Sequence, residues 1–308
     1  MDSDSRILVA GHTGLIGSAV CRALRRQGHD ALILPTRQQC DLTDRAAVED
    51  LFRCERPQYV FLLAAMSGGI KRNATFPAEM IRTNLAIATN VIDAAHRGGV
   101  EKLLFPGSAC AYPRLCPMPI QPGALLSGPL EPTNEPFAVA KIAGMRMCQA
   151  YHRQYGARFI VVVPATVYGP GDHFDENGHV VAALIARFHG AKLRGESEAV
   201  VWGSGRPRRE FIYVDDVAEA MIFLMNRYDG EEIVHIGSGR DIAIADLAAQ
   251  IAHAVGYSGR IIFDSSAPDG MPRRLLDSGP LTVMGVRPKV SLEEGLAATC
   301  AWYERSKS

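Results

Sequence analysis

The stretch Arg6-Ile-Leu-Val-Ala-Gly-His-Thr-Gly-Leu-Ile-Gly17 decides the fold of this chain. It starts with a short apolar run typical of a buried strand, and its glycines lie where a tight turn would lead into a helix. Glycine lets backbone N–H groups approach a pyrophosphate at the helix N-terminus and lets helix and strand pack closely. An ordinary turn is the alternative, but the position after the first strand favours a dinucleotide site. The residues expected to contact the cofactor here are Gly11, Thr13, Gly14, Leu15, Ile16 and Gly17.

Short apolar runs alternate with longer amphipathic stretches through the first half of the chain, which is the pattern of βα units. The predicted strands are Arg6–Ala10, Ala31–Leu34, Tyr59–Ala64, Lys102–Phe105 and Arg158–Val163. The predicted helices are roughly Leu15–Gln27, Asp44–Cys54, Pro77–Arg97 and Pro136–Tyr155. We therefore predict an α/β fold with a Rossmann-like, doubly wound parallel sheet.

The alternation ends near Pro164, where a polar loop at 169–179, a predicted helix near His179–His189 and a Gly- and Arg-rich segment at 200–209 follow. The chain is then expected to return to the sheet with a strand at Phe211–Val214, a helix ending at Tyr228 and a strand at Ile233–Ile236, before a closing segment at Arg260–Trp302. We predict a nucleotide-binding domain of residues 1–164 plus about 211–256, and a smaller C-terminal substrate lobe of about 165–210 plus 257–308.

The composition limits the possible partners. Lys and Arg (33) balance Asp and Glu (33), so no net field attracts nucleic acid or a membrane. A hydrophobic content of 47% argues against disorder. The seven cysteines form no CxxC pair, and the sequence contains no apolar run of about 18 residues and no apolar segment after Met1. We expect a cytoplasmic globular protein without a structural metal, a nucleic-acid partner or a membrane partner.

The residues after the second predicted strand indicate which dinucleotide binds. An NAD enzyme usually has an acid there for the ribose hydroxyls, whereas this chain has Pro35-Thr36-Arg37 and no acid before Asp41. The guanidinium of Arg37 suits a 2′-phosphate, so NADP(H) is the predicted cofactor. The alternative is that Arg37 is an ordinary surface residue that does not contact the cofactor. Asp41 and Leu42 are expected near the adenine.

Three residues predict a proton-transfer site at the end of the fourth strand. Ser108 follows that strand at the edge of the sheet where cofactor and substrate meet. Phe137 and Lys141 are four residues apart and so share one face of a helix. The lysine supplies positive charge, but the phenylalanine has no hydroxyl with which to exchange a proton.

Two further residues are candidates for acid–base chemistry. Cys110 follows Ser108 by two residues, and its thiolate could abstract a proton next to a ketone, although a buried cysteine is more often an inert core residue. His179 starts a predicted helix after a polar loop, from which it could donate a proton to the other face of a sugar ring. A capping or solvent-exposed histidine is an equal alternative.

Arg187 shares a helix face with His179, and Trp202 and Arg209 flank a glycine-rich turn. An aromatic ring beside guanidinium groups suits the base and phosphates of a nucleoside diphosphate. Each of these residues taken alone is more often ordinary surface.

With these motifs the chain resembles the GDP-L-fucose synthase family, within the extended short-chain dehydrogenases/reductases. The resemblance runs from about Arg6 to Trp302. Its marks are Gly11–Gly17, Gly68-Gly69-Ile70, Pro106–Pro113, Glu131–Lys141, His179-Val180, Arg187-Phe-His189, Val201–Gly205, Arg209–Phe211 and Pro268-Asp-Gly270. The resemblance implies NADPH-dependent 3,5-epimerisation and 4-keto reduction of GDP-4-keto-6-deoxymannose.

The resemblance also implies roles for single residues. Cys110 and His179 would be base and acid of epimerisation, and Ser108 and Lys141 would serve the reduction. The residues implied to contact the GDP-sugar are Arg187, Trp202, Arg209 and Asp269; those implied to contact the cofactor beyond the turn are Lys141, Pro164, Val167 and His179. A homodimer through the long helices that end before Gly98 and Gly156 is implied as well.

The sequence departs from the family at two positions. Thr13 replaces a frequent arginine beside the 2′-phosphate, and Phe137 replaces the tyrosine proton donor. General-acid catalysis typically raises a reaction rate by about 10²–10⁴-fold. Without the tyrosine, the rate of reduction should therefore fall, while epimerisation should persist. An engineered Tyr→Phe variant and a natural epimerase that does not reduce remain open alternatives.

Three rival functions share parts of this pattern. A UDP-sugar 4-epimerase also needs the missing tyrosine. A 4,6-dehydratase normally has an Asp-Glu pair where this chain has Ala109-Cys110. A catalytically retired protein that binds NADP or a nucleotide sugar would not require Ser108, Cys110, Lys141 and His179 together.

Overall fold

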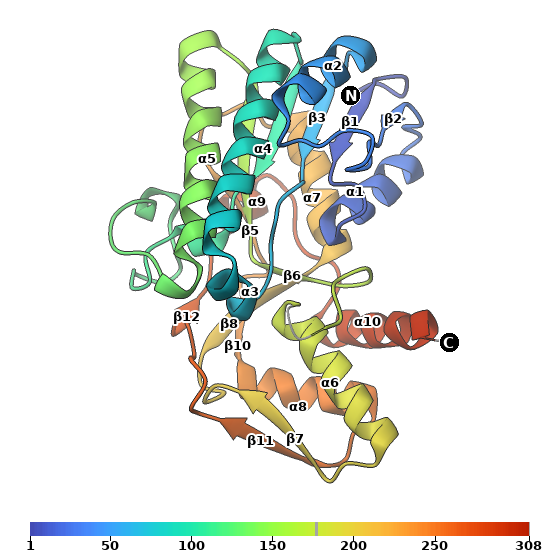
Figure 1. Cartoon of the computed structure of the whole chain (residues 1–308), viewed down its shortest axis with the longest axis vertical. Helices are drawn as coiled ribbons and strands as arrows, with labels where there is room; N and C mark the ends of the chain where they lie inside the picture. Colours follow the sequence, from blue (N-terminus) through green and yellow to red (C-terminus); the bar gives the residue numbers. More distant parts are fainter. Residues whose placement is uncertain (176–177, 308) are drawn as a thin grey trace.

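A six-stranded parallel sheet forms the centre of the larger part of the molecule. The computed structural model describes residues 1–175 and 178–307 (Figure 1). The strand order is β2-β1-β3-β4-β5-β9, and every pairing is parallel. The strands are β1 (Ile7–Ala10), β2 (Leu32–Ile33), β3 (Tyr59–Leu62), β4 (Lys102–Pro106), β5 (Phe159–Pro164) and β9 (Val234–Ile236). This sheet confirms the predicted Rossmann-like fold.

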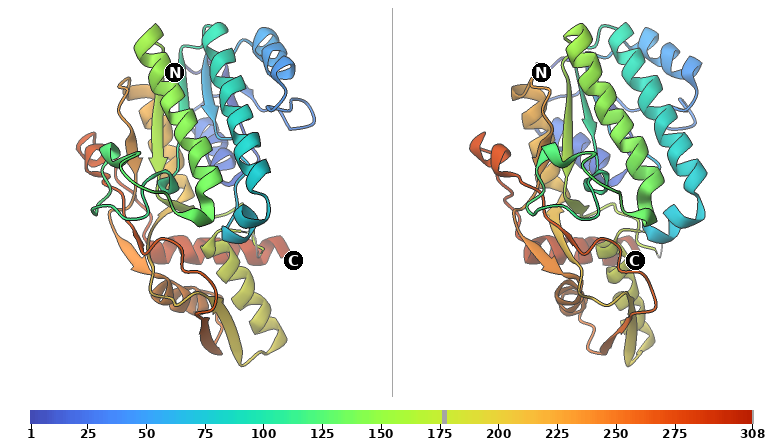
Figure 2. Two further views of the ribbon diagram at one scale, coloured as in Figure 1. Left: turned by 60° about the vertical axis from the view of Figure 1, so that its left-hand side comes forward. Right: turned by 90° about the vertical axis from the view of Figure 1, so that its left-hand side faces the viewer.

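Helices cover both faces of this sheet, as a doubly wound fold requires. On one face lie α1 (Leu15–Arg26) and α7 (Val214–Arg227), which contact each other. On the other face α2 (Arg45–Glu55), α4 (Pro77–Arg97) and α5 (Glu135–Tyr155) form a layer in which α4 and α5 run side by side (Figure 2). The bounds of α4 agree with the prediction, and those of α1, α2 and α5 differ from it by one residue at one or both ends.

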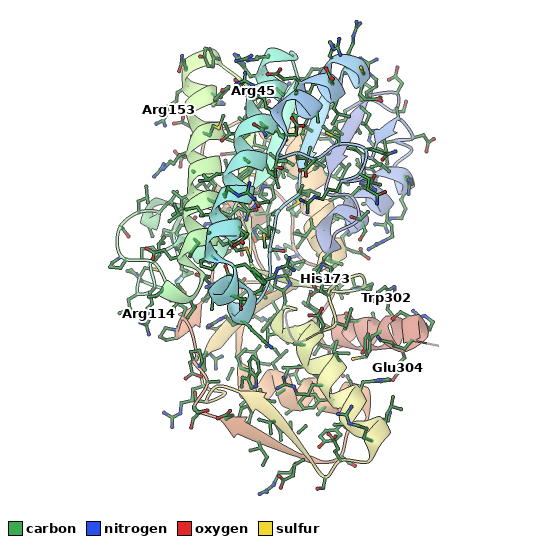
Figure 3. The ribbon with its side chains drawn as sticks, in the orientation of Figure 1. Arg45, Arg114, Arg153, His173, Trp302 and Glu304 are labelled. Carbon is green, nitrogen blue, oxygen red and sulfur yellow. The ribbon has the colours of Figure 1, made fainter. Side chains whose placement is uncertain are left out.

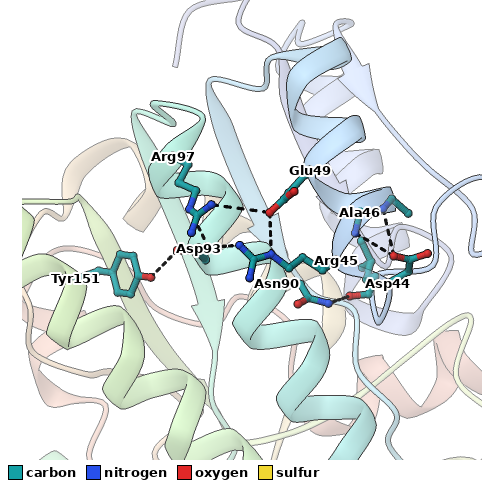
Figure 4. A network of polar contacts seen from close by, with 10 residues as sticks. Asp44, Arg45, Ala46, Glu49, Asn90, Asp93, Arg97 and Tyr151 are labelled. Carbon is teal, nitrogen blue, oxygen red and sulfur yellow. Dashed lines mark hydrogen bonds and ion pairs between the residues drawn. The ribbon is translucent and has the colours of Figure 1, made fainter.

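Polar contacts join α2, α4 and α5 at the surface of that layer (Figure 4). Asp93 of α4 accepts a hydrogen bond from the Tyr151 hydroxyl of α5 at 2.9 Å and forms an ion pair with Arg97 at 3.0 Å. Asn90, one turn earlier, donates to the carbonyl of Leu42 at 3.0 Å. The last bond fixes the loop between β2 and α2, in which the predicted adenine contacts lie.

Helix α5 approaches β4 very closely at Gly144. A Cβ atom at this position would lie 2.3 Å from the Phe105 ring, so only glycine allows the present distance between helix and strand. Because Phe137 and Lys141 lie on the same helix, this contact sets how near they come to the end of β4.

The smaller part of the molecule contains two further sheets. β8 (Arg208–Tyr213) pairs with β6 (Thr166–Tyr168), β10 (Asp241–Ala243) and β12 (Arg273–Arg274), while β7 (Glu198–Trp202) pairs with β11 (Arg260–Asp264). Three helices accompany them: α6 (Val180–Arg194), α8 (Ile244–Val255) and α10 (Leu292–Lys307). The short helices α3 (Ile70–Thr75) and α9 (Gly279–Val283) follow β3 and β12 along the chain.

The structure corrects the predicted return of the chain to the central sheet. The strand expected at Phe211–Val214 is β8, which belongs to the second sheet, and only the strand expected at Ile233–Ile236 joins the central one. The amino-acid sequence of an apolar strand does not indicate which sheet the strand joins, because its partner strands are distant in the chain. The helix expected near His179–His189 runs on to Arg194. The polar loop predicted at 169–179 includes residues 176–177, which lie outside the described residues.

The buried side chains form two clusters, one around the central sheet and one in the smaller part. Leu247 and Ile251 of α8 belong to the second cluster, although 211–256 was assigned to the first domain. Leu276 and Leu281 belong to the first cluster, although 257–308 was assigned to the lobe. The division into two lobes remains a prediction, and the packing favours a boundary soon after Ile236. Within the described chain no helix is both long and apolar enough to cross a bilayer.

Replacing Gly144 by Ala should lower the free energy of unfolding by about 1–3 kcal/mol, because the added methyl group overpacks the contact with Phe105. Chemical denaturation measures the change. Gly123→Ala is the matched control, since nothing lies within 4 Å of its added Cβ, and its effect should stay within about 0.5 kcal/mol. Equal effects of the two substitutions would contradict the close-packing argument.

Candidate active site

The turn between β1 and α1 has the close approaches that a dinucleotide site needs. Gly11 has a φ of 89°, and a Cβ there would lie 2.6 Å from the backbone nitrogen of Ala64. A Cβ at Gly17 would lie 2.0 Å from the carbonyl oxygen of Gly11. Side chains are therefore excluded at Gly11 and Gly17, and the N-terminus of α1 stays open to an anionic group.

Two cavities meet at this turn. The turn cavity, about 600 Å³, is lined by residues that include Gly11, Thr13, Gly14, Arg37, Asp41 and Leu42. The serine cavity, about 310 Å³, is lined by residues that include Gly11, Gly14, Leu15, Ile16, Gly17, Ser108, Phe137, Lys141, Pro164, Val167 and His179. All predicted cofactor contacts thus line one or both cavities, and the shared residues Gly11 and Gly14 make the two cavities neighbours. The residues present fit an extended dinucleotide.

The predicted 2′-phosphate contact lies at the surface of the turn cavity. The side chain of Arg37 is 83% exposed, and its guanidinium lies 3.4 Å from the carboxylate of Asp41. Hydrogen bonds from Thr43 lower the pKa of Asp41, with a smaller contribution from Arg37. His12 lines the same cavity, and its Nδ1 is buried without a hydrogen-bond partner. This histidine, which the sequence analysis did not single out, offers a polar atom to an anionic ligand.

Lys141 connects α5 to the end of β4. Its Nζ donates a hydrogen bond to the carbonyl of Pro106 at 2.8 Å and lies 4.7 Å from the centroid of the Phe105 ring. Burial lowers the pKa of Lys141 to about 8. The ring of Phe137 lies one turn earlier, with its centroid 5.9 Å from Nζ. The structure therefore brings the helix pair and Ser108 together, and the hydroxyl expected between them is absent.

Cys110 lies behind Ser108 and does not itself line the serine cavity. Its side chain is buried, and its thiol donates a hydrogen bond to Ser108 Oγ at 3.1 Å. Burial raises the pKa of the thiol, whereas the positive charges of Arg274 and Lys141 and the bond to Ser108 lower it. The thiol thus reaches the cavity through the serine hydroxyl.

His179 forms a pair with an acid that the sequence analysis missed. It precedes α6 as the N-cap residue, and its Nδ1 lies 3.3 Å from Asp172 Oδ1. The Asp172 side chain is 2% exposed, and this contact raises the pKa of His179. The neighbouring His173, labelled in Figure 3, lies between the central sheet and α6. The sequence shows that Asp172 precedes His179 by seven residues, but it does not predict the loop conformation that brings the two side chains together.

A third cavity, the tryptophan cavity, occupies the smaller part of the molecule. It measures about 680 Å³, and its lining includes Arg187, Trp202, Arg209 and Asp269, the four predicted substrate contacts. The guanidinium of Arg187 lies 5.6 Å from the centroid of the Trp202 ring, and Asp269 accepts hydrogen bonds from the backbone and hydroxyl of one serine. Thr166 and His179 line both this cavity and the serine cavity.

Arg274 is a second residue that the sequence analysis missed. It lines the serine cavity from β12 and directly follows Arg273, which pairs with Asp241 instead, and no sequence signal distinguishes the two arginines.

Comparison with known proteins agrees with this geometry. The model of the NAD dependent epimerase/dehydratase family matches residues 7–237. A GDP-L-fucose synthase 1 from Arabidopsis thaliana is 51% identical over 98% of this chain and 94% of its own length. The crystal structure of a GDP-6-OMe-4-keto-L-xylo-heptose reductase from C. jejuni is 34% identical, with a TM-score of 0.94 over 99% of both chains. That of a GDP-L-fucose synthetase from Naegleria fowleri bound to NADP is 27% identical, with a TM-score of 0.91 over 100% of this chain and 96% of that one. The chain therefore belongs to the NAD dependent epimerase/dehydratase family and, within it, to the group of the GDP-L-fucose synthases.

Proposed function

We propose that the chain epimerises GDP-4-keto-6-deoxymannose at C3 and C5, and that its NADPH-dependent reduction of the 4-keto group is slowed by Phe137. The observation that carries this proposal is that the three cavities are neighbours that share lining residues. The turn cavity contains the glycine turn, the serine cavity next to it contains Ser108 and Lys141, and the tryptophan cavity lies beyond. His179 lines both the serine cavity and the tryptophan cavity. This order is the one that a dinucleotide and a nucleotide sugar bound end to end would require.

NADP(H) is the proposed cofactor, and when bound it supplies the hydride for the 4-keto carbon. The glycine turn would hold its diphosphate, and Arg37 and His12, which line the turn cavity, would contact its phosphate groups. The cofactor in the Naegleria fowleri relative supports this choice over NAD. Lys141 provides the positive charge next to the nicotinamide ribose.

Epimerisation needs an acid and a base on opposite faces of the sugar ring. The 4-keto group acidifies the C–H bonds at C3 and C5. The Ser108 hydroxyl takes up a proton from carbon as it passes its own proton to the Cys110 thiolate, to which it is hydrogen-bonded, and an enolate forms. His179 then delivers a proton from the other face, and the C–H bond is restored with inverted configuration. Ser108 donates a hydrogen bond to the oxyanion. In this scheme the positive charges of Arg274 and Lys141 counteract part of the effect of burial, which still leaves the pKa of Cys110 raised.

Reduction requires a proton for the 4-oxygen as well as a hydride. Phe137 cannot donate one, and Lys141 Nζ is engaged with the Pro106 carbonyl. Proton delivery then falls to water or to Ser108, which lowers the rate of this step and leaves the epimerisation groups intact.

We further propose a homodimer through α4 and α5 in a reducing cytoplasm. The two helices form an outer layer (Figure 2), on which Tyr155 is 52% exposed, and all seven cysteines are free. A monomeric mass in sedimentation analysis would exclude the dimer.

The proposed function is tested by incubating the protein with GDP-4-keto-6-deoxymannose in D₂O, with and without NADPH. Deuterium at C3 and C5 is followed by NMR, and NADPH by absorbance. Exchange with little NADPH oxidation is the expected result. Rapid oxidation would contradict the role given to Phe137, and the absence of both signals would reject the enzyme function and leave a binding protein.

Phe137→Tyr should raise the rate of NADPH oxidation by about 10²–10⁴-fold, because it restores a proton donor four residues before Lys141. The rate of deuterium exchange should change little. Phe76→Tyr, which adds the same hydroxyl to an exposed ring on another helix boundary, is the control. If Phe137→Tyr does not rescue oxidation, the chain is an epimerase in which the reduction machinery has diverged beyond this residue.

Asp172→Asn should move the basic limb of the exchange profile to lower pH. His179 must be protonated to act as the general acid. Because Asp172 raises the pKa of His179, exchange in the wild type extends to higher pH than an unpaired histidine would allow. Removing the carboxylate charge lowers that pKa. Asp215→Asn, whose carboxylate pairs with Arg22 at the surface, should leave the profile unchanged. A shift to higher pH in Asp172→Asn would exclude His179 as the acid.

A further inference from the structure

Tyr112 and His235 form a buried pair next to the loop that carries Ser108 and Cys110. Both side chains are buried. The Tyr112 hydroxyl lies 2.6 Å from His235 Nε2, and the two rings meet edge to face with their centroids 5.3 Å apart. Tyr112 directly follows the short 3₁₀ turn η1 (Ala109–Ala111), whereas His235 is the central residue of β9. The pair therefore joins the loop after β4 to a strand at the edge of the central sheet.

The direction of this hydrogen bond follows from the second contact of the imidazole. His235 Nδ1 lies 3.2 Å from the carbonyl oxygen of Asp277. A carbonyl oxygen can only accept, so Nδ1 carries the proton and Nε2 accepts from the Tyr112 hydroxyl. Burial lowers the pKa of His235 to about 4, so the ring is neutral near neutral pH and keeps Nε2 as an acceptor. Both nitrogens of the imidazole are thereby used.

The carbonyl that the imidazole holds belongs to a segment that directly follows Arg274. The backbone of this segment has further fixed contacts: the amide of Leu276 donates to Glu210 Oε2 at 2.9 Å, and the amide of Asp277 donates to the carbonyl of Ile120 at 2.9 Å. The segment is therefore anchored to the smaller part of the molecule through β8. One imidazole thus connects the η1 turn with the residues that follow the arginine.

Cys110, in the η1 turn, and Arg274 influence each other electrostatically. Burial raises the pKa of the Cys110 thiol, and the charge of Arg274 lowers it more than the charge of Lys141 does. The arginine acts on the thiol from β12 and the lysine from α5. The distance between the η1 turn and the end of β12 therefore affects the stability of the thiolate, and the bond between Tyr112 and His235 holds this distance.

We propose that Tyr112 and His235 are positioning residues, whose hydrogen bond holds the turn of Cys110 at its present distance from Arg274. Neither is among the described residues that line the serine cavity, so both act through Cys110 and not on the substrate. Without the bond the turn could move away from β12, and the thiolate would be less stable because charge interactions weaken with distance. The inference rests on the proposed function for the role of the thiolate, and on the geometry of the pair for its position.

Tyr112→Phe removes the hydroxyl and keeps the ring, so it isolates the hydrogen bond. Deuterium exchange should slow by roughly 10–100-fold through kcat with little change in KM, since the groups that contact the substrate remain. The acidic limb of the exchange profile, which reports formation of the Cys110 thiolate, should move to higher pH. Tyr168→Phe is the matched control, because Tyr168 is also buried and its hydroxyl donates to the carbonyl of Leu292 at 3.4 Å. It should leave kcat and the acidic limb unchanged.

Variants of the partner residue test whether the two side chains act as one unit. His235→Gln keeps an acceptor for the Tyr112 hydroxyl, whereas His235→Leu removes it, so the glutamine variant should retain more activity and shift the acidic limb less. In the double variant Tyr112→Phe/His235→Leu the loss should be no larger than in His235→Leu alone, because the effects of residues that share one interaction do not add. Unchanged far-ultraviolet circular dichroism shows that the variants are folded. Fully additive losses would overturn the proposal.

A measurement without substrate separates this proposal from the function on which it rests. Ionisation of Cys110 is followed by the ultraviolet absorbance of its thiolate, as the difference between each protein and its Cys110→Ser counterpart. The titration should move to higher pH in Tyr112→Phe and stay in place in Tyr168→Phe. If the wild type shows no deuterium exchange, the proposed function is wrong, and the thiolate titration still decides the role of the pair. An unchanged titration in Tyr112→Phe overturns the proposal whether or not exchange occurs.

Discussion

The hydrogen bond from the buried ammonium of Lys141 to the carbonyl of Pro106 is the interaction on which the site depends. It ties α5 to the last residue of β4, directly before the loop that carries Ser108. A buried ammonium without an acceptor would be strongly destabilising, so helix and strand keep this relation. The close contact of Gly144 with Phe105 fixes the same two elements one turn further on. The scaffold of the predicted proton-transfer site is therefore complete although its tyrosine is missing.

The smaller part of the molecule completes the site through one strand pairing. β6 follows β5 directly and pairs with β8, which in turn pairs with β12. This arrangement places Arg209 and Arg274 on one face, near His179 at the start of α6. The strands that meet there are distant in sequence and are held together by the backbone hydrogen bonds of the sheet.

The central sheet was predictable because its signals are local. Apolar runs, glycine turns and helix ends lie next to each other in the chain, and the α4 bounds, Pro77–Arg97, follow from a proline at the start and a glycine after the end. The second sheet was not predictable from such signals. The strand at Phe211–Val214 was placed in the wrong sheet, and α8 packs against α6 and α10, because an apolar segment does not specify which distant partner covers it.

The sequence by itself determined the glycine turn, the Ser108 loop and the 137/141 pair, including the absence of a hydroxyl at Phe137, because each depends on spacing within one turn or helix. Only the tertiary structure decided that Cys110 lies behind Ser108, that Asp172 supports His179, and that Arg274 faces the cavity while Arg273 does not. These relations depend on burial, loop conformation and the pairing of distant strands, and none of them leaves a periodic trace in the amino-acid sequence.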